Sequence, residues 1–176
     1  MIRLSDRFTD NIECGAALTR IARGDASALN VIYDRLAKKI FSLSFSILKE
    51  KCAAEDAMQE TFLRLLRFAG EYKKGESARA WIMAVARNAA IDSLRKRRPT
   101  ESDDALESVA VQSDFSEAIE MNEILSALDD LDRDIVVLKA VDGFRFKEIG
   151  TIVGLSPDAA QKRYRRAIEK LKPLLK

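Results

Sequence analysis

Residues that reverse the direction of the chain are scarce in this sequence, which holds 7 glycines and 3 prolines among 176 residues. A β-sandwich needs a turn about every 8–12 residues, and the chain has too few turn-forming residues for that architecture. Alanine, leucine, isoleucine, arginine, lysine and glutamate dominate the sequence instead, and most of these residues favour helices. The scarcity of turns therefore predicts an all-α protein.

Apolar residues recur at helical spacing through residues 13–97. The segment 40–48 alternates like a strand, but Phe41, Phe45 and Leu48 also fit a helical period, and both flanks are helical. We therefore expect helix there, and further helices over 53–68 and 78–97 with a polar loop at 70–77. Pro99 ends this helical part, because a residue that precedes proline avoids helical geometry.

The net charge of +2 conceals a strong segregation of charge along the chain. Residues 99–134 contain twelve acidic residues and one basic residue, whereas residues 157–176 contain seven basic and two acidic residues. The stretch 95–98 reads Arg-Lys-Arg-Arg, so the pattern predicts two basic surfaces with an acidic spacer between them. Residues 99–116 also lack periodicity. We therefore expect two small helical domains, 1–98 and 117–176, joined by an acidic linker at 99–116.

Composition also narrows the classes of function. The longest apolar runs are short, as at 81–86, whereas a membrane span needs about 20 such residues, so we expect a cytoplasmic chain without membrane insertion. The sequence has no histidine, which excludes catalytic triads that depend on it. Cys14 and Cys52 are the only cysteines, and we expect both as free thiols. We expect no catalytic residues, no metal and no cofactor, and hence no enzyme.

The segment 146–171 has the layout of a helix-turn-helix. A short apolar helix is followed by Gly154, which permits a sharp turn, and by Ser156 and Pro157, which suit the start of a second helix. That second helix is basic along one side, and it leaves polar and cationic side chains free to pair with bases in a major groove. A solvated basic face on an ordinary helical hairpin is the alternative, which the combined turn, cap and cations disfavour.

Three motifs in order resemble the extracytoplasmic-function (ECF) group of alternative bacterial RNA polymerase sigma factors, in the sigma-70 family. Residues 54–65 are similar to the motif that binds core polymerase, and residues 80–98 to the helix that reads the −10 element. Residues 128–138 and 146–171 resemble the domain that reads the −35 element. Where many members carry Gly-Thr-Val, the recognition helix here begins Asp158-Ala159-Ala160, so the −35 sequence does not carry over.

The resemblance implies core RNA polymerase, promoter DNA and an anti-sigma factor as partners, and it implies three sets of contact residues. The residues implied for core polymerase are Asp56, Gln59, Glu60 and Phe62, although core packing is an equally open role for Phe62. The residues implied for −10 DNA, including a base held outside the stack, are Tyr72, Lys73, Lys74, Ser77, Asn88, Arg95 and Arg97. Arg79 and Arg87 are further candidates for contacts to phosphate. The residues implied for −35 DNA are Ser156, Gln161, Lys162, Arg165 and Arg166.

Two other classes of function remain open at this point. A helix-turn-helix activator would bind promoter DNA without being a polymerase subunit, but residues 13–97 lack the α/β pattern of a receiver domain. A purely helical interaction protein would bind no DNA at all. DNA binding that weakens steeply as the salt concentration rises would exclude this last class, because such binding depends on contacts to phosphate.

Overall fold

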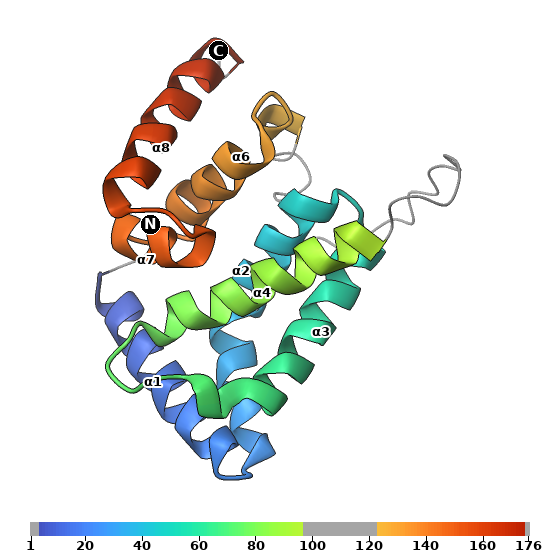
Figure 1. The fold of residues 1–176 in the computed structure, drawn as a ribbon, viewed down its shortest axis with the longest axis vertical. Helices are drawn as coiled ribbons and strands as arrows, with labels where there is room; N and C mark the ends of the chain where they lie inside the picture. Colours follow the sequence, from blue (N-terminus) through green and yellow to red (C-terminus); the bar gives the residue numbers. More distant parts are fainter. Residues whose placement is uncertain (1–3, 97–122, 175–176) are drawn as a thin grey trace.

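The computed structural model describes residues 4–96 and 123–174 of the chain. Within these ranges the regular structure is helical, and the only β pairing is the isolated bridge between Lys74 and Glu76. The predicted all-α fold is confirmed (Figure 1). None of the described helices combines the length and the apolar character that a membrane crossing requires. The expected linker, 99–116, lies outside the described residues.

The first half of the protein, residues 4–96, consists of long helices connected by short turns. In chain order these elements are α1 (Leu4–Ala22), η1 (Ala26–Ala28), α2 (Leu29–Leu48), α3 (Lys51–Phe68), η2 (Ala69–Glu71) and α4 (Ala78–Lys96). The segment 40–48, which alternates like a strand, lies inside α2 and is helical as predicted. The first helix begins at Leu4, well before the predicted start at residue 13.

Two polar side chains set the tight connections between these helices. Asp25 accepts a hydrogen bond from the amide of Ser27 and caps η1. Between α2 and α3, Lys49 adopts the left-handed conformation with φ 58°, and the Glu50 carboxylate accepts from the amides of Cys52 and Ala53 at 2.7 and 3.0 Å. A side chain that satisfies the free amides of a first turn stabilises the helix start. The chain therefore reverses here without a glycine.

The second half, residues 123–174, contains the predicted helix-turn-helix. Its elements are α6 (Asp130–Val136), a π-helical turn η3 (Val137–Val141), α7 (Phe146–Val153), α8 (Pro157–Leu171) and η4 (Lys172–Leu174). Gly154 ends α7 with φ 75°, and the Ser156 hydroxyl accepts from the amide of Ala159 at 3.2 Å. A Cβ atom on Gly150 would lie 2.5 Å from the carbonyl oxygen of Leu155. Glycine at 150 is therefore what lets the turn fold back onto α7.

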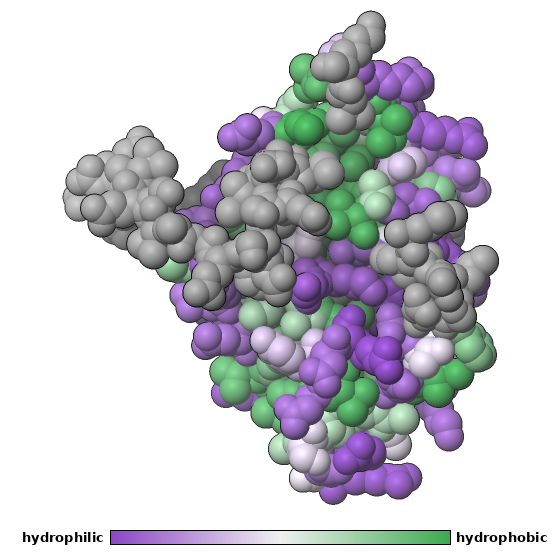
Figure 2. All heavy atoms as spheres, turned by 180° about the vertical axis from the view of Figure 1, so that it is seen from behind, coloured by the Kyte–Doolittle hydropathy of each residue, from purple (hydrophilic) through white to green (hydrophobic). Residues whose placement is uncertain are grey.

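The two halves pack on one another and share one hydrophobic core. Buried residues of the first half, such as Ile82 and Met83, belong to the same cluster as Ile135, Phe144 and Ile149 of the second half. We call this contact surface between the halves the seam. Figure 1 shows the second half against one side of the first-half helices. From behind, apolar and polar groups alternate over the lower part of the molecule, which belongs to the first half (Figure 2).

Candidate nucleic-acid interface

An outward stripe runs along α3, where we expected contacts to polymerase. Asp56 and Gln59 are exposed on it, and Leu63 and Leu66 continue the same stripe. Spacings of three and four residues place side chains on one face of a helix. Leu63 is 50% exposed and Leu66 is 39% exposed, so two large apolar side chains lie together on the stripe, which suits a docking surface. The stripe therefore joins two polar and two apolar groups, and the sequence analysis had missed the two leucines.

Phe62, also expected to contact polymerase, does not belong to that stripe. Its side chain is 9% exposed and lies in the core, with its ring 5.4 Å from the ring of Tyr33. One residue of helix corresponds to a rotation of about 100°, which turns Phe62 inward and Leu63 outward. The alternative role in core packing is the one that the structure supports.

Glu60 connects the α3 stripe to α4 through an arginine. The Arg64 guanidinium donates from Nε to Glu60 at 2.8 Å and from Nη1 to Asp92 on α4 at 2.9 Å. The hydrogen bond from Arg64 lowers the pKa of Glu60, so this carboxylate is held in its charged form. Glu60 is half-buried and already paired. It therefore presents less free charge to a partner than Asp56 does.

The loop before α4 offers cations but holds its aromatic side chain. Lys73 and Lys74 are exposed and form no ion pair within the described residues. Tyr72 is half-buried, donates from its hydroxyl to the Glu76 carbonyl at 3.0 Å, and packs edge-on against Trp81. In this conformation Tyr72 is therefore not a free platform on which a base could stack.

Along α4 the expected DNA contacts divide into exposed and covered groups. Asn88 and Arg95 are exposed, and Arg95 has no ion pair in the described part of the chain. Arg97 lies outside the described residues. Arg87 and Arg79, which we had considered as phosphate contacts, are instead covered by the second half. The Arg87 Nε lies 2.8 Å from Asp134, and the Arg79 guanidinium stands 4.4 Å from the centre of the Phe144 ring.

The seam is charged as well as apolar. Ser77, expected at the −10 strand, donates instead to Glu148 of α7 at 2.9 Å. Burial raises the pKa of Asp134 to about 6, against the opposing effect of its partner Arg87. Burial raises the pKa of Asp142 to about 8, although Lys39 and Arg79 lower it. Carboxylates of the second half thus face cations of the first half across a dry surface.

The recognition helix α8 presents unpaired cations on its outer face. Lys162, Arg165 and Arg166 are exposed and form no ion pair with any described residue. Gln161 is half-buried, and Ser156 is exposed while its hydroxyl caps α8. Arg163, in contrast, is tied to α6, with its Nε 2.7 Å from Asp132. The outer cations are therefore free for DNA phosphates or bases, whereas Arg163 holds the fold.

Comparisons with known proteins define the class of this fold. A family model described as "Sigma-70 region 2" matches residues 32–100, and one described as "Sigma-70, region 4" matches residues 118–171. The chain belongs to the sigma-70 family of RNA polymerase sigma factors. Within that family, it belongs to the ECF group.

Relatives match nearly the full length of the chain. The RNA polymerase sigma factor CarQ of Myxococcus xanthus is 33% identical over 165 residues, which cover 90% of this chain and 95% of CarQ. The ECF sigma factor SigM of Bacillus subtilis is 32% identical over 155 residues, which cover 83% of this chain and 94% of SigM.

Two solved structures share the fold at low sequence identity. CnrH, solved with the cytosolic domain of CnrY, matches with a TM-score of 0.74 and 23% identity over 93% of this chain and 97% of CnrH. RpoE of Bartonella quintana, solved with the anti-sigma factor NepR, matches with a TM-score of 0.62 and 21% identity over 78% of this chain and 89% of RpoE.

Proposed function

We propose that this chain is a transcription initiation factor that binds core RNA polymerase, directs it to specific promoters and assists opening of the −10 strand. The polymerase supplies the catalysis, and this chain supplies the promoter address, so it is not itself an enzyme. Because bacterial promoters lie on the chromosome, we propose that the chain acts in the cytoplasm. The observation that carries the proposal is the separation of the α3 stripe from two sets of exposed, unpaired cations.

The three surfaces are assigned on exposure and charge. The α3 stripe, with Asp56 and Gln59, docks on polymerase. The −10 strand is held by the loop before α4 and by the outer side of α4. The −35 duplex is read by α8. The residues proposed for DNA are Lys73, Lys74, Asn88 and Arg95 for the −10 strand, and Ser156, Gln161, Lys162, Arg165 and Arg166 for the −35 duplex. Tyr72 and Ser77 remain proposed contacts to the −10 strand, and each must first be released from its present contacts. Arg97 also remains a proposed contact, and it lies outside the described residues.

The proposed domains are 1–98, a linker at 99–116, and 117–176, boundaries that the extents of the two family models support. Promoter binding requires these domains to separate. Two elements almost two duplex turns apart lie roughly 70 Å from one another, at about 34–36 Å per turn. The packed halves cover Ser77 and Arg87 as well. We therefore propose that polymerase binds the open form of the chain.

An anti-sigma factor is the proposed regulator. RpoE of Bartonella quintana was solved with such a partner, which supports the same relationship here. An inhibitor of this kind either covers the α3 stripe or holds the halves together. The second candidate function, an activator that binds promoter DNA without being a polymerase subunit, is less favoured because the described first half is helical and has no receiver-like sheet.

Reconstitution with bacterial core polymerase tests the proposal. The chain should bind promoter DNA weakly alone and specifically with core enzyme, and sequencing of transcripts should give defined start sites. Asp56→Arg with Gln59→Ala should abolish core binding while the unfolding free energy changes by only about 0.5 kcal/mol. Asp34→Arg, which reverses an exposed carboxylate on α2, is the matched control. Tight and specific promoter binding by the isolated chain would favour the activator instead.

A further inference from the structure

A cleft of about 590 Å³ lies where α1, the start of α4 and α7 meet, so both halves of the protein build it. Figure 1 shows these three elements side by side. Cavities of about 300–1,000 Å³ are typical of small-molecule sites. Four cationic side chains line this one: Arg7, Arg79, Arg145 and Lys147. None of the four forms an ion pair with a described residue.

Two carboxylates also line the cleft but leave its charge positive. Glu148 is already engaged, since its oxygens accept from the Ser77 hydroxyl and the Arg145 amide, both at 2.9 Å. Glu76 is exposed at the rim. With four cations against two carboxylates, the lining favours an anion, and arginine is the side chain best suited to bind phosphate oxygens.

Arg79 is the strongest indication of a ligand. Its side chain is 1% exposed, and its Nε and Nη2 atoms have no hydrogen-bond acceptor. The ring of Phe144 partly compensates the charge from 4.4 Å, and the carboxyl group of Asp142 faces the same guanidinium, but neither accepts a hydrogen bond from these two N–H groups. The Nε of Arg7, on the facing helix, is likewise buried without an acceptor. Buried donors of this kind cost free energy, which an anion with several oxygens would recover.

Flat apolar surfaces lie beside these cations. Phe8 is 71% exposed on α1, although large apolar side chains are usually covered. Trp81 is half-buried, lines the same cleft, and is held edge-on by Tyr72 at 6.0 Å between ring centres. Aromatic faces next to arginines are the combination on which nucleic-acid bases stack.

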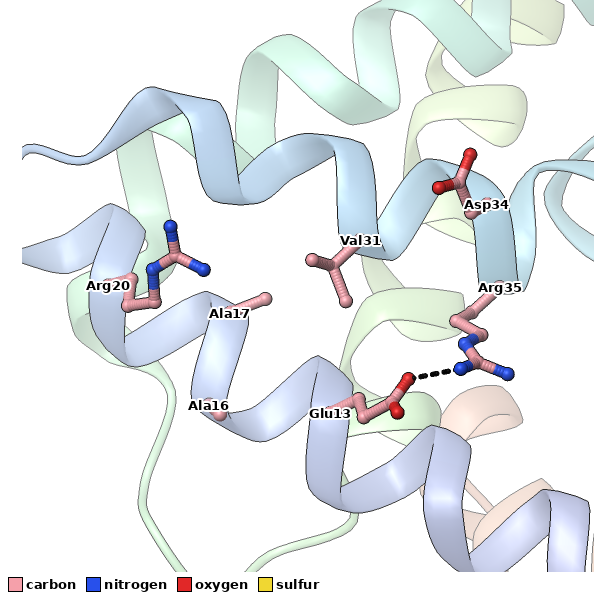
Figure 3. A pocket seen from close by; sticks show the side chains of 7 residues that line it. All are labelled: Glu13, Ala16, Ala17, Arg20, Val31, Asp34 and Arg35. Carbon is pink, nitrogen blue, oxygen red and sulfur yellow. Dashed lines mark ion pairs between the residues drawn. The ribbon is translucent and has the colours of Figure 1, made fainter.

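A second cavity, which lies within the first half, has the opposite character. It measures about 350 Å³ and lies between α1 and α2 (Figure 3). Both of its arginines are paired, since Glu13 and Arg35 lie 2.6 Å apart and Arg20 pairs with Asp25 at the same distance, and its remaining charged side chain is the carboxylate of Asp34. Paired charges of this kind leave little field for a ligand, so the unpaired cations are a property of the cleft between the halves.

We propose that the cleft between α1, α4 and α7 binds a free nucleotide, with its phosphates on the four cations and its base against Phe8 and Trp81. This goes beyond promoter recognition, because the site takes a small molecule and is complete only while the halves are packed together. The nucleotide therefore binds the closed form of the chain.

The sequence provides its own probe, because Trp81 is the only tryptophan. Adenosine and guanosine diphosphates should change its fluorescence saturably in the full chain without polymerase. Inorganic pyrophosphate, followed by competition, should bind about tenfold more weakly or worse, since it lacks a base to stack. Arg145→Ala with Lys147→Ala should weaken nucleotide binding about tenfold or more. Both side chains are exposed, so this variant should stay folded, and Arg23→Ala at the far end of α1 is the control.

Four outcomes overturn the proposal. The first is the absence of a saturable response to either nucleotide, and the second is unchanged affinity in the double variant. The third is binding of a short single-stranded oligonucleotide when neither nucleotide binds, which would assign the cleft to the promoter strand. The fourth is equal affinity for pyrophosphate and nucleotides, which would mean that the base contributes nothing to binding in the cleft. Because no polymerase is present, these results are independent of whether the chain directs transcription.

Discussion

Deprotonation of the buried Asp142 should lower the free energy of unfolding as the pH rises through neutrality. Asp142 is fully buried in the seam, one of its carboxylate oxygens has no hydrogen-bond partner, and the charges that face it are Lys39 and Arg79. Burial raises its pKa from 3.8 to about 8, so the folded chain binds this proton more tightly than the unfolded chain. The stabilisation is complete below the unfolded pKa and is lost as the pH rises through the folded pKa. Between about pH 6.5 and 8.5 the free energy of unfolding should fall by about 2 kcal/mol.

Urea denaturation followed by circular dichroism, repeated across this range, measures the effect. Other side chains titrate little in this window, because the chain has no histidine, burial raises the pKa of Cys14 to about 12, and the Glu50 carboxylate raises the pKa of Cys52 above its ordinary value. Asp142→Asn should make stability nearly independent of pH there, whereas Asp158→Asn, at an exposed position on α8, should keep the slope. A wild-type stability that is flat or rises over this range would refute the argument from burial, and so would an unchanged slope in the Asp142→Asn variant.

Four other substitutions test the turn, the seam and the DNA surfaces. Gly150→Ala should lower the free energy of unfolding by about 1–3 kcal/mol, because the new methyl group meets the backbone of the turn; a neutral effect in thermal denaturation would contradict the close approach. Arg87→Ala should cost about 3 kcal/mol by removing the partner of the buried Asp134, and a surface-like cost would mean that the pair is hydrated. With polymerase, Arg165→Ala should weaken binding to the −35 duplex by about 1–3 kcal/mol in a sequence-dependent way. Asn88→Ala should spare that step and impair strand opening, reported by a fluorescent base at −10; equal losses of duplex binding alone would contradict two separate surfaces.

Local sequence signals predicted the helices and the helix-turn-helix correctly. Periodicity extends over many residues, and the signals at Gly154 and Ser156 act within a few residues of the chain. The phase of α3 was harder, because Phe62 and Leu63 are both apolar and only their rotation about the helix axis separates core from surface. Gly150 was missed for a related reason, since a glycine inside a helix does not show which backbone approaches it.

The seam could not be predicted from the sequence. Arg87 lies on a helix that carries other cations, and such a residue is usually solvated. Its partner Asp134 is 47 positions away along the chain, within a run of carboxylates that indicated only an acidic segment. Pattern and propensity describe neighbours on one element. They do not indicate which elements of two helical halves meet.

Because the two halves share one core, a partner that binds only the separated halves must first overcome the contacts that hold them together. If about 1% of molecules are open, the apparent affinity for such a partner falls about 100-fold below its intrinsic value. A substitution that weakens the seam then has two opposite signatures, a lower melting temperature and a tighter apparent complex. Variants selected only for stronger promoter activity are therefore expected to cluster at Asp134 and Phe144, which lie in the seam and outside the proposed polymerase and DNA surfaces.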